Sequence, residues 1–342
     1  MKAAVLGTGL LGGSVAAALR SIGWHVTGWD PNPETRVLIL ETGVVDAVES
    51  EPEAAMSGVD LIVLAGPPAA ISATLRDTDP EHFGDALIMD VGGVKQQAIA
   101  AAEAIPRFVG THPMAGREFG GAAGASAALF YGALWIITED GARPEDLDTI
   151  EQLIENMGAS PLRMGATQHD EAVALISHLP QVVAASLVRL AHDAPEAIEL
   201  ASGSFRDLTR VALSDPAMWT DILFSNRDFV AGAIGELEAT LATFRQALRD
   251  GDRGWVTGRL VKSRETRSTM APSVVGIEVH LKDEPGELAG VGRALAATRC
   301  DIRDLQMRHG RHGGGGILTL SVRPGEAPTL RAALVSEGFT LT

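Results

Sequence analysis

The sequence predicts an α/β fold with a parallel sheet, followed by an all-helical region and a small α+β unit. Three observations support this prediction. Short apolar runs alternate with helical patterns over residues 1–165, strand patterns are absent over residues 166–270, and strands and helices return over residues 274–342. We therefore expect three domains with these bounds, which a chain of 342 residues is long enough to form.

The composition excludes several classes of partner. A formal net charge of −16 argues against a nucleic-acid surface, because phosphate binding needs clustered Lys and Arg. We find no apolar run long enough to span a bilayer, and we interpret the apolar N-terminus as part of the fold rather than as a signal peptide. The single cysteine, Cys300, excludes an intrachain disulfide and fits a reducing cytoplasm. We expect no nucleic-acid, membrane or metal partner.

The first region alternates strands with helices, an order that predicts a parallel sheet covered by helices on both faces. The expected strands are Lys2–Gly7, His25–Asp30, Asp60–Ala65, Ala86–Val91, Arg107–His112, Ala133–Thr138 and Pro161–Gly165. The expected helices between them include Ser14–Ser21, Glu34–Glu41, Val94–Ala104 and Pro144–Met157.

The second region is predicted to be consecutive helices punctuated by Gly203 and Pro216, with Asp215 capping the helix that follows it. One helix carries apolar residues at alternating spacings of four and three, which is a heptad seam for another helix. The seam residues are Val230, Ile234, Leu237, Leu241, Phe244 and Leu248. The seam fits either an intramolecular core stripe or a dimer interface.

The third region follows an expected linker, Met270–Ser273. Its patterns predict the order strand, helix, strand, strand, helix, with a further strand at the C-terminus. The expected elements are Val274–Leu281, Pro285–Thr298, Asp301–His309, Ile317–Arg323, Ala327–Glu337 and Phe339–Leu341, with a glycine-rich turn at Gly313–Gly316.

The N-terminus carries the pattern Gly7-x-Gly9-x-x-Gly12 between an expected strand and an expected helix. Such glycines let the backbone turn tightly and approach a pyrophosphate at the helix N-terminus. The second strand ends in Asp30, and a carboxylate there accepts hydrogen bonds from ribose hydroxyls and repels a 2′-phosphate. We therefore expect NAD rather than NADP, bound by Gly7, Thr8, Gly9, Leu10, Leu11, Gly12 and Asp30. The alternative is a glycine turn without a cofactor.

Two further glycine segments follow the ends of later strands, where ligands of open parallel sheets bind. Gly66 and Pro67 follow one strand, and Gly92 and Gly93 follow the next. We expect them to form walls of the nicotinamide pocket. The alternative for each residue is an ordinary strand-to-helix turn.

His112 ends an apolar strand, immediately before a proline and a tight glycine turn. The ordinary pKa of an imidazole, near 6.5, allows it to accept a proton from a substrate hydroxyl at neutral pH. Its expected place beside the nicotinamide favours a catalytic role over a structural one.

A second cluster of polar residues lies in the helical region. The segment Ser177–Gln181 is expected to start a helix, and Arg206 and Arg210 share one face if their segment is helical. Two guanidinium groups near an active site suit a dicarboxylate substrate, because each can hold a carboxylate with two hydrogen bonds. The alternative is a solvated Arg/Asp surface.

These motifs resemble those of the prephenate dehydrogenase family. The matching segments are GTGLLGGS with Asp30, DVGGVK (90–95), GTHPMAGRE (110–118), HDEAVALISHLP (169–180), GSFRDLTR (203–210) and Met218-Trp219. The C-terminal unit, with the turn DEPGEL (283–288), resembles an ACT regulatory domain. The resemblance covers nearly the whole chain.

The resemblance implies an NAD-dependent oxidative decarboxylation of prephenate to 4-hydroxyphenylpyruvate, a step of tyrosine biosynthesis. In that reaction His112 takes the proton of the C4 hydroxyl, and Arg210 grips a substrate carboxylate. By the same resemblance, Asp207 and Trp219 shape the pocket and Glu118 gates it. Arg117 and Arg206 are expected in the substrate site as well.

Two positions depart from the family pattern. Family members often carry Ser where this chain has Gly93, and many read SHLPH where this chain has Gln181. Gln both donates and accepts hydrogen bonds, so it suits a keto acid or an amino acid. Arogenate and 4-amino-4-deoxyprephenate therefore remain alternatives to prephenate.

Two other functional classes are weighed against this one. β-Hydroxyacid dehydrogenases use a lysine in the helical region, and this chain has no lysine between Lys95 and Lys262. A sensor of NAD and amino acids would bind both without turnover. The resemblance also implies a homodimer, with tyrosine as an allosteric ligand near Asp283 and Gly286; the alternative for the ACT-like unit is a purely dimerising module.

Overall fold

The computed structural model describes residues 1–116, 121–201, 203–270, 274–282, 284–309 and 315–341. The chain divides into two compact units, Met1–Ala239 and Thr240–Thr342. The expected linker at 271–273, and the expected site residues Arg117, Glu118 and Asp283, lie outside the described residues.

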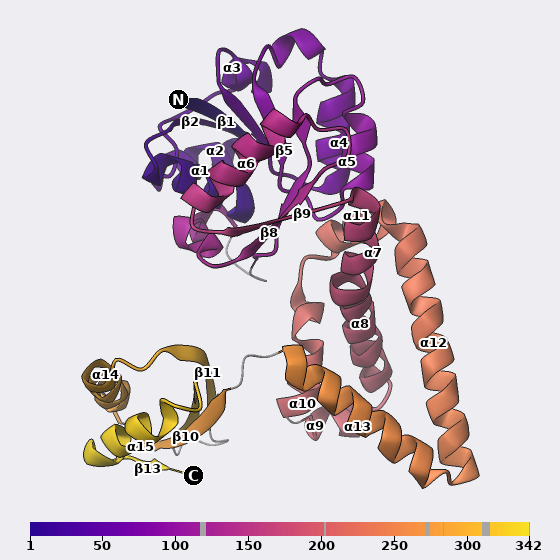
Figure 1. The fold of residues 1–342 in the computed structure, drawn as a ribbon, viewed down its shortest axis with the longest axis vertical. Helices are drawn as coiled ribbons and strands as arrows, with labels where there is room; N and C mark the ends of the chain where they lie inside the picture. The colour runs from indigo at the N-terminus through magenta and orange to yellow at the C-terminus, as the bar shows by residue number, and fades with distance from the viewer. Residues whose placement is uncertain (117–120, 202, 271–273, 283, 310–314, 342) are drawn as a thin grey trace. The chain divides into compact units, whose positions relative to one another are not determined.

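The first unit is built on a six-stranded parallel sheet with the order β3-β2-β1-β4-β5-β6 (Figure 1). This is the strand order of doubly wound dinucleotide-binding folds, whose ligands bind beyond the carboxyl ends where the order reverses, here between β1 and β4. The strands are β1(Lys2–Leu6), β2(His25–Trp29), β3(Ala47–Val48), β4(Leu61–Leu64), β5(Leu87–Asp90) and β6(Phe108–Val109). The predicted parallel sheet is confirmed, although the two-residue strand β3 was not predicted.

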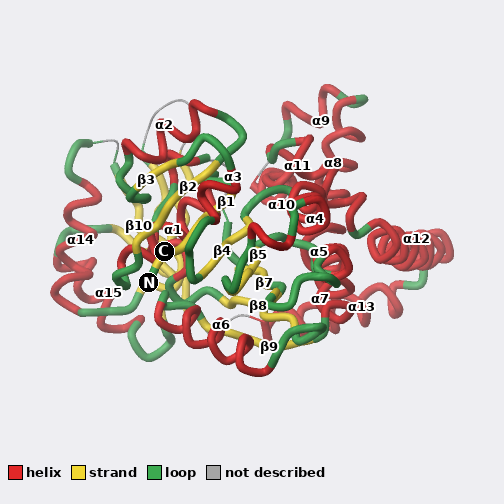
Figure 2. The backbone as a smooth tube through the Cα atoms, turned by 90° about the horizontal axis from the view of Figure 1, so that it is seen from above, coloured by secondary structure: helices red, strands yellow, loops and turns green. Residues whose placement is uncertain are grey.

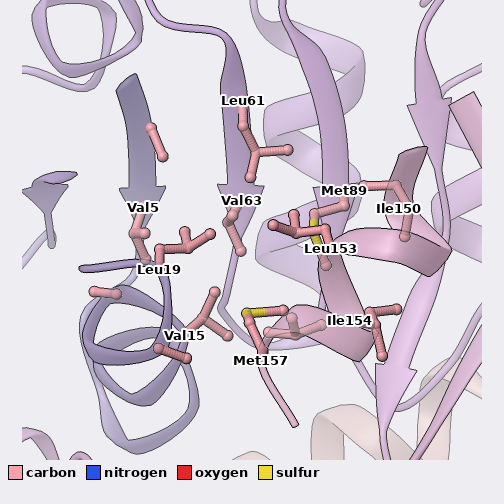
Figure 3. Packing of buried hydrophobic residues seen from close by; sticks show 14 of the residues in the cluster. Val5, Val15, Leu19, Leu61, Val63, Met89, Ile150, Leu153, Ile154 and Met157 are labelled. Atoms are coloured by element: carbon pink, nitrogen blue, oxygen red, sulfur yellow. The ribbon is translucent and has the colours of Figure 1, made fainter. Parts of the chain in front are cut away.

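Alternate residues of the strands face opposite sides of the sheet, so each side has its own apolar core. Ala3 and Val5 face one core, whereas Ala4 and Leu6 face the other. Figure 3 shows the first core, in which strand residues such as Val63 lie among side chains of α1 and α6. Each Val or Leu buried in this way contributes roughly 1.5–3 kcal/mol.

The helices and 3-10 turns of the nucleotide-binding region cover both faces of this sheet, and those before residue 108 connect its strands. The helices are α1(Leu10–Ser21), α2(Pro33–Glu41), α3(Pro52–Met56), α4(Pro68–Asp77), α5(Gln96–Ala101) and α6(Pro144–Asn156). The 3-10 turns are Pro80–His82, Ala122–Gly124 and Ala127–Phe130.

A second, smaller sheet follows the first, with the order β7-β8-β9. Its strands are β7(Thr111–Pro113), β8(Leu134–Thr138) and β9(Ser160–Met164), and β7 runs antiparallel to β8. The expected single strand over residues 107–112 is therefore wrong, because the chain leaves the large sheet at Gly110. A Cβ on Gly110 would lie only 2.5 Å from Thr138 Oγ1, so this corner needs glycine.

The helical region begins with one continuous stretch, α7(Ala166–Val173), a π-helical turn (Ala174–His178) and α8(Leu179–His192). As expected, a helix starts within Ser177–Gln181, since α8 begins at Leu179, but α8 directly continues the helical stretch that begins at Ala166. Local π turns are frequently found at functional sites.

This stretch, Ala166–His192, has 27 residues and a mean hydropathy of 1.5 in its most apolar window. By length and composition alone it is able to cross a membrane, which corrects the expectation that no apolar run is long enough. Buried polar side chains lie within it, at His169, Asp170, His178 and Gln181. Hydrogen bonds of His169, Asp170 and His178 to other elements tie the first half of the stretch to the first unit, and 33% of its most apolar window is buried.

The remaining elements before residue 270 are helical, and Figure 2 shows this part of the chain as helices and loops. They are α9(Pro195–Glu199), α10(Gly203–Thr209), the 3-10 turn Arg210–Leu213, α11(Pro216–Ser225), α12(Arg227–Asp250) and α13(Arg253–Met270). As predicted, Asp215 caps α11, since its Oδ1 accepts a hydrogen bond from the Met218 N–H at 2.7 Å. Along the predicted seam of α12, Val230 is buried, whereas Leu241 and Leu248 are exposed.

The C-terminal part forms an antiparallel sheet with the order β11-β12-β10-β13. Its elements are β10(Val275–Leu281), α14(Glu287–Thr298), β11(Ile302–His309), β12(Gly316–Val322), α15(Ala327–Ser336) and β13(Thr340–Leu341). This is the split βαβ arrangement of ferredoxin-like folds, which confirms the predicted α+β unit. Its core joins Ile277 and Val279 of β10 to Leu330 and Leu334 of α15.

Candidate active site

A cavity of the first unit has a volume of about 700 Å³. It lies beyond the carboxyl ends of β1, β4 and β5 and is lined on its other side by the helical region. Its lining residues are Gly9, Leu10, Leu11, Gly12, Ala65, Gly66, Pro67, Pro68, Val91, Gly92, Gly93, Gly116, Gly121, Ile176, Ser177, Pro180, Gln181, Val211, Ser214, Asp215, Met218, Trp219 and Ile222. The cavity therefore brings the glycine segments and the helical region together.

The glycine turn after β1 is packed too tightly for side chains at two of its three positions. A Cβ on Gly12 would lie 1.8 Å from the Gly7 carbonyl oxygen, and one on Gly7 would lie 2.0 Å from the Ala65 oxygen. Gly7 also has a φ of +90°, which disfavours any residue with a side chain. Gly9, by contrast, has no atom within 4 Å of its Cβ position and faces open space.

This arrangement fits a dinucleotide in two respects, the open helix N-terminus for the pyrophosphate and the carboxylate at the end of β2 for the ribose. Gly9 precedes α1, so an unobstructed backbone meets a helix N-terminus where a pyrophosphate is favoured. The Asp30 carboxylate accepts the Thr8 N–H at 2.8 Å and the Asn32 N–H at 3.0 Å. Arg36 donates to the Asp30 carbonyl oxygen, and this contact holds its guanidinium beside the end of β2.

The glycines after β5 lie between the cavity and His112. Gly92 and Gly93 both line the cavity, and Gly66 and Pro67 line it from β4. A Cβ on Gly93 would lie 3.7 Å from His112 Nε2, so a hydroxymethyl group at this position would reach the imidazole. Because residue 93 is glycine, no side chain from this position fills the space beside His112 Nε2.

His112 is half-buried on β7, and a chain of side chains leads from it into the helical region. His112 Nδ1 lies 2.8 Å from His169 Nε2, and the two rings meet edge to face. On its other side, His169 Nδ1 lies 2.7 Å from Asp170 Oδ1. Asp170 in turn accepts the backbone N–H groups of Lys95 at 2.8 Å and Gln96 at 2.9 Å.

A buried ion pair supports the same corner. Lys95 and Asp90 have no exposed side-chain area, and the Lys95 ammonium contacts Asp90 Oδ2 and donates to the Thr111 carbonyl oxygen at 2.6 Å. Asp90 also accepts the N–H groups of Gly92 at 2.9 Å and Thr111 at 3.1 Å. The pair therefore ties the end of β5 and the glycine wall to the residue before His112.

Burial favours the neutral form of two imidazoles of this site, His112 and His178. Desolvation lowers the pKa of His112 well below 6.5, and the charges of His169, Lys95 and His178 lower it further. Desolvation also lowers the pKa of His178 to about 4, against an opposing effect of Asp170. A neutral His112 is able to accept a proton at pH 7, which is the property that a general base requires.

The substrate-side residues predicted from the sequence fall into three groups. Gln181 and Trp219 line the cavity, and Gln181 is only 8% exposed. Arg206, Asp207 and Arg210 are exposed on α10 and at the start of the 3-10 turn after it, and they are not among the lining residues. Arg117, Glu118 and the regulatory residue Asp283 lie outside the described residues.

Sequence reasoning missed the residues that support His112. They are Asp90, Lys95, His169, Asp170, His178 and Asn226, whose Nδ2 donates to the Asp170 carbonyl oxygen at 2.8 Å. The segments DVGGVK and HDEAVALISHLP contain all of them except Asn226. The signal was present in these motifs, but nothing in their spacing indicated which side chains meet.

The fold and the cavity define a class of protein: an oxidoreductase that binds a dinucleotide beside a half-buried, neutral imidazole. The comparisons with known proteins narrow this class. The nucleotide-binding domain of prephenate dehydrogenase matches residues 15–162, and the dimerization domain of prephenate dehydrogenase matches residues 165–262. The chain belongs to the prephenate dehydrogenase family, which confirms the resemblance found in the sequence.

Individual relatives agree with this assignment. A prephenate dehydrogenase of Bacillus subtilis is 31% identical, over 94% of this chain and 92% of the relative. The crystal structure of prephenate dehydrogenase from Aquifex aeolicus with hydroxyphenyl propionate and NAD⁺ has a TM-score of 0.73 at 28% identity, covering 79% of this chain and 98% of that one. The arogenate dehydrogenase of Synechocystis has a TM-score of 0.67 at 26% identity, covering 79% and 100%.

Proposed function

We propose that this enzyme catalyses the NAD-dependent oxidative decarboxylation of prephenate to 4-hydroxyphenylpyruvate. The observation that carries this proposal is the environment of His112. Its Nδ1 faces His169, and its Nε2 faces Gly93 at the wall of the cavity. A neutral imidazole with one nitrogen held and the other directed to a cavity wall suits a base for a substrate hydroxyl.

The proposed mechanism assigns His112 to the C4 oxygen of the substrate. When bound, the nicotinamide supplies the oxidant that accepts the hydride from C4. His112 Nε2 takes the proton of the C4 hydroxyl as its O–H bond breaks, and it returns a proton when loss of CO₂ makes the ring aromatic. Because aromatisation drives the reaction, the protein mainly orients the substrate and moves this proton.

The remaining residues are proposed to bind the two ends of the substrate and the cofactor. Gly7, Gly12 and Asp30 hold the dinucleotide, in accordance with the packing of the glycine turn. Gln181 and Trp219, which line the cavity, contact the substrate. Arg210 remains a candidate for a substrate carboxylate by family resemblance.

Arogenate is the second candidate substrate, and one observation favours it. Gln181 Oε1 is buried and has no hydrogen-bond partner among the described residues. A buried acceptor of this kind is satisfied by a donor, and the side-chain ammonium of arogenate is a donor whereas the keto oxygen of prephenate is not. Rotation of the amide would present its NH₂ group instead and would suit prephenate.

A spectrophotometric assay separates these candidates. Formation of the reduced cofactor is followed with prephenate or arogenate, each combined with NAD or NADP, and kcat/KM is compared. We expect NAD with prephenate to give the highest value. A higher value for arogenate would overturn the substrate assignment, and turnover with neither would overturn the proposed function.

We further propose a homodimer that is regulated through its C-terminal part. The match to a dimerization domain and the exposed seam residues Leu241 and Leu248 support a homodimer. The ferredoxin-like C-terminal part, with Gly286 at a φ of +101° before α14, supports a tyrosine-binding ACT-like unit. Sedimentation with and without tyrosine tests both: a monomer would exclude the dimer, and absence of heat on calorimetric titration would exclude tyrosine binding.

A further inference from the structure

The side chains behind His112 form a continuous chain that lies outside the cavity lining. It runs from His112 on β7 to His169 and Asp170 on α7, with contacts of 2.8 Å and 2.7 Å. His169 and Asp170 are each only 1% exposed, so water is kept from both contacts. A buried chain of this kind leaves few arrangements of its hydrogens.

The hydrogen positions follow from the carboxylate at one end. An ionised Asp170 carboxylate only accepts, and its two oxygens already accept the backbone N–H groups of Lys95 and Gln96. The nitrogen that faces it, His169 Nδ1, therefore donates. With its ring proton on Nδ1, His169 presents a bare Nε2 that accepts, so His112 Nδ1 donates to it and His112 Nε2 carries the lone pair.

We propose that His169 and Asp170 are positioning residues that hold His112 as the tautomer with its proton on Nδ1. This inference rests on the proposed function, because it assigns a task to the neighbours of the proposed base. Only this tautomer presents a bare nitrogen at Nε2, on the side of Gly93 and the cavity. The opposite tautomer would direct an N–H at the substrate hydroxyl and could not take its proton.

Asp170, at the far end of this hydrogen-bond network, is held by several contacts. Asp170 caps the start of α5 through the Lys95 and Gln96 N–H groups, and its own carbonyl oxygen accepts the Asn226 side chain at 2.8 Å. Elements from both the nucleotide-binding region and the helical region thus fix one carboxylate. The orientation of His112 is set from the helical region, although His112 itself belongs to the small sheet.

His169 and Asp170 orient His112, and they do not accept the proton that His112 takes from the substrate. The substrate proton goes to His112 Nε2, and the resulting imidazolium keeps its Nδ1–H on His169. Asp170 accepts from His169 throughout, as the carboxylate does in other acid–base arrays with a buried aspartate.

Asp170→Asn tests the proposal most sharply. The Asn amide has one accepting oxygen in place of two, so it cannot accept from Lys95, Gln96 and His169 as the carboxylate does. In the orientation that turns its nitrogen to His169 Nδ1 it donates to that nitrogen, which reverses the hydrogen order and places the His112 proton on Nε2. We expect kcat to fall about 10²-fold or more while the Kd for NAD changes by less than about threefold. Selective ¹⁵N-histidine NMR should show His112 Nε2 without a proton in the parent enzyme and with one in the variant.

A pair of variants at position 169 keeps the test valid if Asp170→Asn fails to fold. His169→Leu removes the acceptor, whereas the amide oxygen of His169→Gln is able to accept from His112 Nδ1. We expect His169→Leu to lose about 10²-fold in kcat and His169→Gln to recover about tenfold of that loss. His192→Leu, at an exposed histidine of the same helical stretch, is the matched control and should leave kcat unchanged.

Two outcomes would overturn the inference. One is a kcat within about threefold of the parent enzyme in both Asp170→Asn and His169→Leu. The other is a His112 that carries its proton on Nε2 in the parent enzyme. Parallel measurement of His112→Asn separates this failure from failure of the proposed function, because only the latter predicts an active His112→Asn enzyme.

Discussion

The two sides of the cavity are built by different means. The nucleotide side consists of backbone packed so closely that a Cβ on Gly12 would lie 1.8 Å from the Gly7 carbonyl oxygen. The substrate side depends on side chains, which connect His112 through His169 to Asp170. The nucleotide side is therefore fixed by close packing of backbone without side chains, and the substrate side by hydrogen bonds between side chains.

This difference predicts different responses to mutation. A backbone turn has no partner to replace, so a substitution acts through steric overlap. A buried network fails when one member is removed, because the partners that remain are buried without compensation. Single and paired substitutions should therefore behave differently on the two sides.

The largest effect on stability is expected at the ion pair. Lys95→Met leaves the Asp90 carboxylate buried without its cation, which should destabilise the fold by about 3–5 kcal/mol. Adding Asp90→Asn removes the unpaired charge and should recover part of this loss. Chemical denaturation measures both, with Lys262→Met, at an exposed lysine, as the control. Equal stability of Lys95→Met and the parent would show that the pair does not support this corner.

A smaller effect is expected at the glycine turn, where two positions form a matched pair. Gly12→Ala forces a Cβ against the Gly7 carbonyl oxygen. It should lower the free energy of unfolding by about 1–3 kcal/mol and should also abolish NAD binding. Gly9→Ala meets no atom of the protein, so the thermal midpoint should stay while NAD affinity falls about tenfold. Thermal unfolding and NAD titration separate the two. Tight NAD binding by Gly9→Ala would mean that the dinucleotide does not approach this turn.

The difference between the two sides of the cavity also explains which parts of the site could be predicted from the sequence. The glycine turn and Asp30 were predictable because the motif itself lies within one strand–turn–helix–strand unit, in which the Asp30 carboxylate accepts the Thr8 N–H 22 positions away. The His112–His169 contact joins residues 57 positions apart, and the Lys95–Asp170 contact spans 75. Periodicity and spacing carry no information about contacts of this range, so the network appeared only in the structure.

Two local features also escaped prediction, for tertiary reasons. The apolar run over residues 107–112 reads as one strand, but the chain turns at Gly110, where the close approach of Thr138 leaves no space for a side chain. The π turn Ala174–His178 lies inside an unbroken helical pattern, and Pro180 made the following residues resemble a helix start. In both cases the sequence predicted the type of element correctly, but it did not predict where the strand ends or that the helix continues.

The account depends most directly on His112 as the base. The measurement that tests it is the kcat of His112→Asn with prephenate and NAD, together with the Kd for NAD from titration of the same variant. We predict a loss of about 10²–10⁴-fold in kcat with a Kd changed by less than about threefold. A kcat close to that of the parent enzyme would contradict the account and leave His112 with a structural role only.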